Sequence, residues 1–270
     1  MNIKKLSLFA VVGALVAALA LFGCSSGDDG AKKDDGGNAA STDSGYTLIN
    51  DGKLTVAASL DFPPFENLNG DKAEGFEVDL MNALAEEMGL ECEYLPSTKF
   101  DTIVPLIQTG GKADVGVSGI TINDERLEQV DFTDPICDVN QSISVLKDSG
   151  YKSASDLEGK KVGAQTGTTG YEWAAENIKD VEVVGFDEMT AVYAALSSGQ
   201  IDAVAVDLPV GNYYVKAYTD CEVIQEIPTG EQYGIAVSKE NPELTKALNE
   251  AIKAVRANGK YDELAAKWLQ

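Results

Sequence analysis

Two stretches of the sequence share one pattern and decide the fold: Gly111-Lys-Ala-Asp-Val-Gly-Val-Ser118 and Gly199-Gln-Ile-Asp-Ala-Val-Ala-Val206. Each begins at a glycine that ends a predicted helix and continues as a short apolar run typical of a buried strand. Their acids, Asp114 and Asp202, occupy the same place in the two runs. The correspondence predicts two halves built on one plan; a chance similarity between short units is the alternative.

Strands and helices alternate on both sides of these stretches. The predicted strands are residues 53–58, 91–95, 113–118, 161–164, 181–184 and 201–206, and the predicted helices are residues 76–88, 101–108, 171–177 and 190–197. Such alternation is typical of sheets with parallel strands covered by helices. We predict an α/β fold of two lobes, each a β-sheet flanked by helices, with hinge crossings near residues 135–141 and 230–235.

Polar residues follow the ends of four predicted strands. Ligands of open α/β sheets bind beyond the carboxyl ends of the strands, so these residues are expected to face a crevice shared by the lobes. They are Ser59, Ser118 with Gly119, Gln165 and Asp207.

The run from Ser118 to Arg126 brings a hydroxyl and a guanidinium together after a strand. Arg126 is one of two arginines in the chain, the other being Arg256. Arginine can hold a carboxylate through two parallel hydrogen bonds, which lysine cannot do. The alternative is a surface arginine paired with a nearby acid.

A second anion site is predicted at Gln165-Thr-Gly-Thr-Thr-Gly170, where free amides at a helix start join threonine hydroxyls. The run lacks the ending of a nucleotide-binding loop, so a carboxylate is the expected ligand. Asp207 either caps the next helix or binds a substrate ammonium. Together with Arg126, these groups complement a zwitterion, and we therefore predict an α-amino acid ligand.

Composition excludes several functions. The 270 residues carry a net charge of −23 and no histidine. Nucleic acid is therefore not an expected partner, because phosphate binding requires clustered lysine and arginine. The commonest general base and metal ligand is absent, and we expect no catalytic residue, metal or cofactor.

The N-terminus has the pattern of an export signal. Lys4 and Lys5 precede an apolar run that ends at Leu-Phe-Gly-Cys24, which looks like a bacterial lipobox. We predict a signal peptide at residues 1–23 and lipidation of Cys24, which would anchor the chain to the outer face of the cytoplasmic membrane. An uncleaved signal anchor is the alternative. Residues 24–45, rich in Gly, Ser and Asp, are predicted to form a flexible tether.

The remaining cysteines are Cys92, Cys137 and Cys221. Their number is odd and their spacing matches no zinc pattern. We expect thiols, or at most one disulfide that the sequence does not assign.

Further segments carry a resemblance to a known family. They are Asp61-Phe-Pro-Pro-Phe-Glu66, Gly75-Phe-Glu-Val-Asp-Leu80, the Ser118 to Arg126 run with Asp131-Phe-Thr-Asp-Pro135, Gln232-Tyr-Gly-Ile-Ala-Val237 and Asn258-Gly-Lys-Tyr-Asp262. In this order they resemble the polar amino-acid solute-binding proteins of ABC importers, extracellular solute-binding protein family 3. The resemblance implies a type II periplasmic-binding-protein-like fold, with lobe 1 at residues 46–138 and 234–270 and lobe 2 at residues 139–233.

The same resemblance implies roles for the site residues. Arg126, Thr121 and the Gly119 backbone would bind the ligand carboxylate with help from Thr169, while Asp207 and Gly119 would bind its ammonium. Thr168 is a further candidate ligand-binding residue. Phe62 and Phe100 would flank the ligand side chain, with ordinary core packing as the alternative for both. The partner would be a membrane permease, and the binding protein would act as a monomer.

Two positions bear on which amino acid the site would select. Some family members carry an acid at the position of Ser59 or a basic residue at that of Gln165, whereas both positions are neutral here. We predict capture of a polar or cationic amino acid. Two alternatives remain: an amino-acid sensing domain, although the chain shows no output segment, and a dehydratase-type enzyme on the same scaffold.

Overall fold

The computed structural model describes residues 40–41 and 45–269. The predicted signal peptide and Cys24 lie outside the described residues, as does most of the predicted tether. The chain divides after Gly36 into two units, and the fold below is that of the second, Gly37–Gln270. Within the described residues, no helix has the length and apolarity needed to span a membrane.

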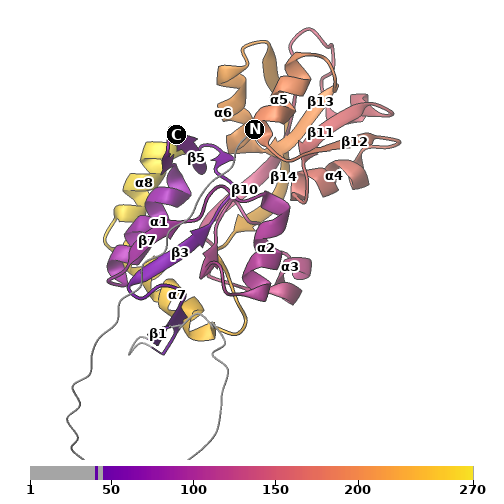
Figure 1. The fold of residues 1–270 in the computed structure, drawn as a ribbon. Coiled ribbons are helices and arrows are strands. Elements are labelled where there is room, and N and C mark those ends of the chain that lie inside the picture. Colours follow the sequence, from indigo (N-terminus) through magenta and orange to yellow (C-terminus); the bar gives the residue numbers. More distant parts are fainter. Residues whose placement is uncertain (1–39, 42–44, 270) are drawn as a thin grey trace, which may run out of the picture. The chain divides into compact units, whose positions relative to one another are not determined.

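The second unit contains two five-stranded sheets, one in each lobe (Figure 1). The first sheet has the order β7 (Glu91–Tyr94), β3 (Lys53–Ala57), β8 (Val115–Gly116), β15 (Ala236–Val237) and β9 (Asp131–Phe132). The second has the order β12 (Glu182–Phe186), β11 (Lys161–Gln165), β13 (Ala203–Asp207), β10 (Cys137–Leu146) and β14 (Cys221–Tyr233).

Both sheets follow one plan: three parallel strands, then two strands that pair antiparallel. The two acids that align in the sequence also have one role. An oxygen of Asp114 accepts a hydrogen bond from the Thr55 amide (2.7 Å), and an oxygen of Asp202 accepts one from the Lys161 amide (2.9 Å). Each acid thereby binds the middle one of the three parallel strands in its own sheet, β3 for Asp114 and β11 for Asp202. The predicted two-lobed α/β fold and its internal repeat are confirmed.

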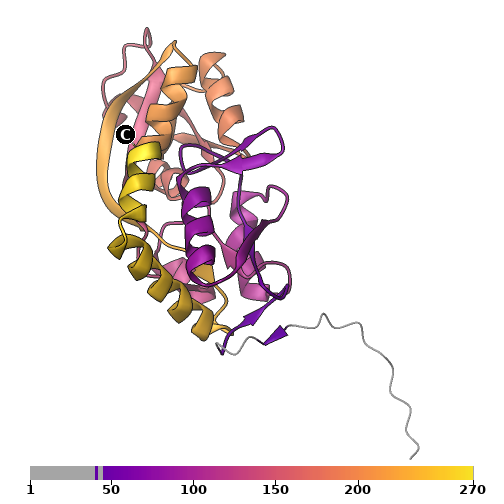
Figure 2. The same cartoon turned by 90° about the vertical axis from the view of Figure 1, so that its left-hand side faces the viewer.

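Helices cover both faces of each sheet. The helices are α1 (Phe76–Glu87), α2 (Phe100–Thr109), α3 (Asp124–Gln129), the 3-10 turn Ala154–Leu157, α4 (Thr169–Asn177), α5 (Met189–Ser197), α6 (Leu208–Ala217), α7 (Pro242–Ala257) and α8 (Lys260–Trp268). Along β13, Val204 and Val206 belong to the core cluster that includes α5 and α6 side chains, while Ala203 and Ala205 belong to the cluster under α4. This alternation follows from the two-residue period of a strand. In the first lobe α1 packs against α7 and α8, side by side in Figure 2.

Strand β8 is shorter than the predicted 113–118. The strand ends at Gly116, and the backbone turns at Gly119, whose φ of 57° lies in the left-handed region that glycine favours. Within β8, a Cβ on Gly116 would come 2.7 Å from the Ile103 side chain, so the glycine lets α2 approach the strand. The early end of the strand places the 118–126 run beyond the sheet, toward the second lobe.

The two predicted crossings form one antiparallel ladder. Strands β10 and β14 pair from Cys137 opposite Tyr233 to Leu146 opposite Cys221, with an irregularity between Val139 and Gln141. This ladder joins the lobes. A small three-stranded sheet of β4 (Asp61–Phe62), β5 (Glu66–Asn69) and β6 (Lys72–Glu74) lies on the first lobe, and β1 (Ala40–Ser41) pairs with β2 (Thr47–Leu48).

The predicted thiols are also seen, because Cys92, Cys137 and Cys221 are free cysteines.

Candidate functional site

Arg126 lies in α3, which begins with an Asn123 cap that accepts a hydrogen bond from the Arg126 amide. Arg126 is 8% exposed; its Nη1 donates to the Thr121 carbonyl (2.8 Å) and its Nη2 to the Gly167 carbonyl of the second lobe (3.1 Å). The guanidinium carbon lies 5.4 Å from the centre of the Phe100 ring. Phe100 therefore packs under Arg126, a contact that orients the cation.

Burial lowers the pKa of Arg126, and the negative charges of Glu172, Asp207 and Glu231 oppose that effect. Because these acids already offset the charge of Arg126, a ligand carboxylate must compete with them for the guanidinium. The local charge thus favours a ligand that brings a positive group together with its carboxylate.

The predicted anion turn forms the start of α4. Thr168 is its N-cap: the hydroxyl accepts a hydrogen bond from the Tyr171 amide (3.2 Å) and donates to the Gln165 carbonyl (2.7 Å). The Thr168 side chain is thus committed to the local structure. Thr169 is the first residue of the helix, where backbone N–H groups lack helical acceptors and face outward to an anion.

The crossing strand contributes Glu231, which the sequence analysis did not identify. One carboxylate oxygen of Glu231 accepts hydrogen bonds from the hydroxyls of Thr121 (2.8 Å) and Thr169 (2.6 Å), and the other accepts one from Gln141 (3.1 Å). The two threonines come from different lobes. Their hydroxyls are therefore directed to a protein carboxylate, and the Thr169 amide is the group left to receive a ligand carboxylate. A search of the predicted crossings for polar side chains would have found both Gln141 and Glu231.

Asp207 ends β13 and is 5% exposed. Its Oδ1 accepts a hydrogen bond from Gln141 Nε2 (3.0 Å), and although it directly precedes α6, its side chain makes no capping hydrogen bond. The alternative that the Asp207 side chain caps the next helix is therefore wrong. Burial raises the pKa of Asp207 to about 7, and the charge of Glu231 adds to this effect.

Ser118 and Gly119 are held from behind by two acids. Ser118 Oγ donates to Glu66 (2.8 Å), and the Gly119 amide donates to Glu77 (2.8 Å). The Gly119 amide is thus unavailable as a carboxylate donor, which leaves the Gly119 carbonyl as the group for an ammonium. A Cβ on Gly119 would come 3.0 Å from the Phe62 ring, so the glycine also permits close contact with that aromatic.

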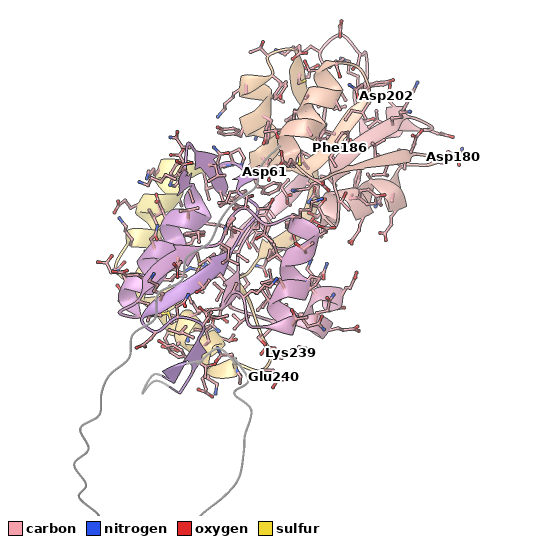
Figure 3. The ribbon with its side chains drawn as sticks, viewed as in Figure 1. Asp61, Asp180, Phe186, Asp202, Lys239 and Glu240 are labelled. Atoms are coloured by element: carbon pink, nitrogen blue, oxygen red, sulfur yellow. The ribbon has the colours of Figure 1, made fainter. Side chains whose placement is uncertain are left out.

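The other predicted residues gather around the point where the lobes meet. Ser59 Oγ donates to Asp61 (2.9 Å), and the second Asp61 oxygen accepts a hydrogen bond from the Met189 amide of the other lobe (2.8 Å). Figure 3 shows Asp61 at the junction of the two lobes. Gln165 is 1% exposed; its Nε2 donates to the Asp187 carbonyl (3.0 Å), while its Oε1 has no hydrogen-bond partner in the part of the chain that the structure describes.

Two hollows open between the lobes beside these groups. One, of about 420 Å³, is lined by Thr121, Thr169 and Glu231 among others, and one of about 240 Å³ is lined by Phe100 and Arg126 among others. The predicted carboxylate-binding groups thus border solvent-accessible space.

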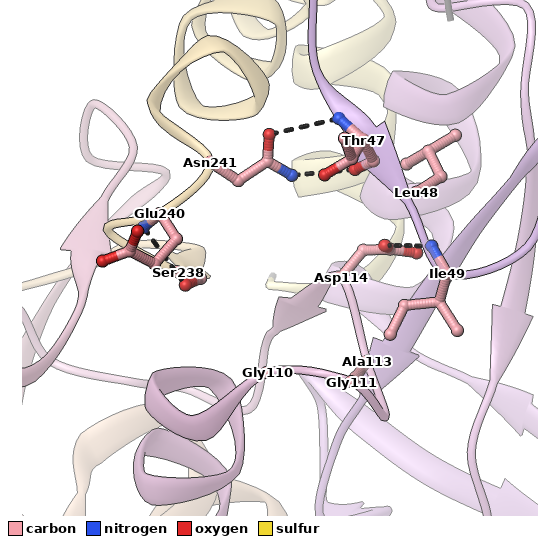
Figure 4. Close-up of a pocket in the computed structure, with 10 residues that line it drawn as sticks. All are labelled: Thr47, Leu48, Ile49, Gly110, Gly111, Ala113, Asp114, Ser238, Glu240 and Asn241. Carbon is pink, nitrogen blue, oxygen red and sulfur yellow. Dashed lines mark hydrogen bonds between the residues drawn. The ribbon is translucent and has the colours of Figure 1, made fainter. Parts of the chain in front are cut away.

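A third hollow, of about 330 Å³, lies elsewhere on the first lobe (Figure 4). Its polar side chains already have structural partners. Asn241 exchanges two hydrogen bonds with the Thr47 backbone (3.3 and 2.8 Å), and Asp114 accepts one from the Ile49 amide (2.8 Å). These contacts bind the N-terminal strand to the lobe, and the hollow contains none of the predicted ligand residues.

Comparison with known proteins agrees with this geometry. Residues 54–270 match the family described as bacterial extracellular solute-binding proteins, family 3. The chain is 33% identical over 223 residues to "ABC transporter arginine-binding protein 1" of Escherichia coli (strain K12), covering 80% of this chain and 90% of the relative. It is 34% identical over 222 residues to "L-cystine-binding protein TcyJ" of the same strain, covering 81% and 83%.

Solved structures share the fold. "An ancestral arginine-binding protein bound to arginine" is 40% identical, with a TM-score of 0.77 and coverage of 81% of this chain and 99% of that one. These neighbours have the predicted type II periplasmic-binding-protein fold. The chain belongs to the bacterial extracellular solute-binding proteins of family 3.

Proposed function

We propose that this chain is the extracytoplasmic component of an ABC importer that captures a cationic amino acid between its lobes. Arg126 and the Thr169 amide bind the ligand carboxylate, while Asp207 and the Gly119 carbonyl bind its ammonium. The ligand connects groups from both lobes, so it stabilises the closed arrangement that a permease would recognise.

The environment of Asp207 carries the proposal. A buried carboxylate normally has a cationic partner, since desolvation of an unpaired charge is costly. Among the described residues, no lysine or arginine forms an ion pair with Asp207. The groups that hydrogen-bond to it are neutral: the amide of Gln141 and the hydroxyl of Tyr233. A ligand ammonium would supply the missing charge and favour the ionised form of the acid.

The balance of charge around the cleft supports the cationic class. Glu172, Asp207 and Glu231 act on the guanidinium of Arg126, and Asp61 adds a further acid at the contact between the lobes. A cleft with excess negative charge concentrates cations and repels anions. Arginine, lysine and ornithine are therefore expected to bind more tightly than glutamine, and glutamate least tightly.

Several further features belong to the same proposal. Lipidation at Cys24 and a tether of residues 24–45 would hold the protein at the outer face of the membrane. Lobe 1 would comprise residues 46–138 and 234–270, and lobe 2 residues 139–233. The protein would act as a monomer that delivers its ligand without chemical change, so that incubation with the bound amino acid returns that amino acid intact.

The experiment is a binding titration with purified protein. Isothermal calorimetry would compare arginine with ornithine, glutamine, glutamate, and two arginine analogues: agmatine, which lacks the carboxylate, and N-acetylarginine, which lacks the ammonium charge. Arg126→Lys and Asp207→Asn test the two ends of the site. Arg256→Lys is the matched control, because Arg256 binds the Pro135 carbonyl and packs on Tyr261 outside the cleft.

We expect arginine to bind and both analogues to bind at least about a hundredfold more weakly, since each leaves a buried site group unpaired. Arg126→Lys should weaken arginine binding by about tenfold or more, because it loses the planar fork of donors. Arg256→Lys should leave affinity unchanged. Agmatine binding as tight as arginine, or a preference for glutamate, would refute the assignment.

A further inference from the structure

Two glutamates lie buried beneath the turn that carries the proposed ligand groups. Glu66 is 1% exposed at the start of β5, and Glu77 is 0% exposed in the first turn of α1. They come from separate segments of the first lobe and meet behind Ser118 and Gly119. Both acids contact the Ser118–Gly119 turn, but neither is among the groups proposed to bind the ligand, so ligand binding alone does not explain them.

Each acid holds one group of the turn. Glu66 Oε1 accepts a hydrogen bond from Ser118 Oγ (2.8 Å), and the same hydroxyl accepts one from the Ser59 amide (3.0 Å). Glu77 Oε2 accepts a hydrogen bond from the Gly119 amide (2.8 Å). The hydroxyl and the amide of adjacent residues are thereby fixed from one side.

The other carboxylate oxygen of each acid, Glu66 Oε2 and Glu77 Oε1, is buried and accepts no hydrogen bond from an N–H or O–H group of residues 45–269. The two carboxyl groups act on each other, and the titratable groups around them are Asp61, Tyr94, Cys137 and Tyr233, none of which is a cation. Two adjacent buried carboxylates with no cation nearby cannot both stay ionised. One proton shared between the two free oxygens removes one negative charge and gives each oxygen a hydrogen bond.

Burial raises the pKa of both acids, and the charge of Glu77 raises that of Glu66 further. The Gly119 amide opposes the rise for Glu77, because it stabilises the ionised form. The proton therefore belongs mainly to Glu66.

We propose that Glu66 and Glu77 are positioning residues of the amino-acid site, sharing one proton in a carboxyl–carboxylate hydrogen bond that holds the Ser118–Gly119 turn. The proposal rests on the proposed function for the role of that turn in ligand binding. Thr121 and Arg126 follow the turn directly, so a shift of its backbone would displace the groups at both ends of the ligand.

Glutamine substitutions test the proton count. In Glu66→Gln, the new amide can donate to Glu77 as the shared proton did, while its oxygen still accepts from Ser118. In Glu77→Gln, the amide can donate to an ionised Glu66, while its oxygen accepts from Gly119. Each single variant keeps one donor facing one acceptor. The double variant places two N–H₂ groups against each other and has no such match.

We expect each single variant to bind arginine within about threefold of the wild type, with Glu66→Gln the milder, since it mimics the favoured proton position. The double variant should bind about tenfold or more weakly than the product of the two single effects predicts. Infrared difference spectra between each single variant and the wild type, at neutral pH, should show loss of the C=O stretch of a protonated carboxylic acid.

Other outcomes would overturn the proposal. A role based only on buried charge predicts that the double variant is the most stable and binds at least as well as the singles. Absence of the protonated carboxyl band from the wild type would exclude the shared proton, whether or not any variant folds. If the wild type bound no amino acid, the proposed function would fail, while the infrared result would still decide the state of the pair.

Discussion

The contact of Asp61 with the second lobe makes a quantitative prediction about closure. Its Oδ2 accepts a hydrogen bond from the amide of Met189, the first residue of α5, whose preceding residue Glu188 makes no side-chain cap. An acid of one lobe thus caps a helix of the other. The Asp61 carbonyl also accepts a hydrogen bond from the Tyr214 hydroxyl of α6 (3.0 Å).

The size of the effect on the equilibrium between closed and open forms depends on which bonds to Asp61 are lost when the lobes separate. The bond from Ser59 to Asp61 lies within one lobe and survives opening, so of the bonds to Asp61 only those from Met189 and Tyr214 favour the closed form. A charge-assisted bond to a helix N-terminus is worth about 1.5 kcal/mol, and a neutral one about 1 kcal/mol. Asp61→Ala should therefore reduce the ratio of closed to open molecules about tenfold, and Tyr214→Phe about fivefold.

Two assays distinguish stabilisation of the closed form by Asp61 from direct contact between Asp61 and the ligand. Small-angle X-ray scattering should show a larger radius of gyration for Asp61→Ala than for the wild type. Calorimetry should show that Asp61→Ala weakens binding of every amino acid by a common factor, because each ligand must meet the same cost of closure. Asp61→Asn retains a neutral acceptor and should fall between the wild type and Asp61→Ala.

An effect of Asp61→Ala that depends on the ligand would refute a role of Asp61 in closure alone. If Asp61→Ala weakened arginine and lysine but left glutamine unchanged, Asp61 would be a contact for the ligand's cationic side chain. Tyr214→Phe serves as the control for that case, because it removes a cross-lobe bond without altering the charge of the site.

Two further predictions concern the fold. Gly75→Ala should lower the free energy of unfolding by about 3 kcal/mol in urea titrations, because φ is 136° and a Cβ would lie 2.2 Å from the Phe65 carbonyl oxygen; a loss below about 1 kcal/mol would contradict the clash. Burial raises the thiol pKa of Cys92 and Cys137 to about 12 and of Cys221 to about 11, so iodoacetamide should alkylate them slowly at mildly alkaline pH until the protein unfolds. Rapid labelling of all three thiols in the native protein would contradict the reactivity inferred from their burial.

The alternation of strands and helices could be predicted from the sequence because it depends on local periodicity. Helix α1 begins near Phe76 and ends before Gly89, whose φ of 70° fits the predicted stop. The placement of Arg126 and Asp207 near one crevice followed from the rule that ligands bind at strand ends. These inferences need only the order of elements along the chain.

The partners of those residues could not be predicted, because they come from distant segments. Glu231 reaches the Thr121 hydroxyl from 110 positions away, and Glu77 reaches the Gly119 amide from 42. These contacts depend on how distant segments pack together, which cannot be read from a local sequence pattern. Glutamate on a crossing strand or in a first helical turn looks like an ordinary surface residue. The resemblance therefore named the residues that would hold the ligand and missed those that orient them.

Closure and recognition are thereby assigned to different residues. The bonds from Met189 and Tyr214 to Asp61 join the lobes without using the predicted ligand groups, so they contribute equally for every ligand. Arg126 and Asp207 contribute according to the ligand's own charges. Because apparent affinity is the intrinsic affinity scaled by the closed fraction, changes at the first set should multiply all affinities by one factor. Changes at the second set should alter their order, since specificity is a difference between affinities. A protein of this design can adjust how tightly it binds without changing what it selects.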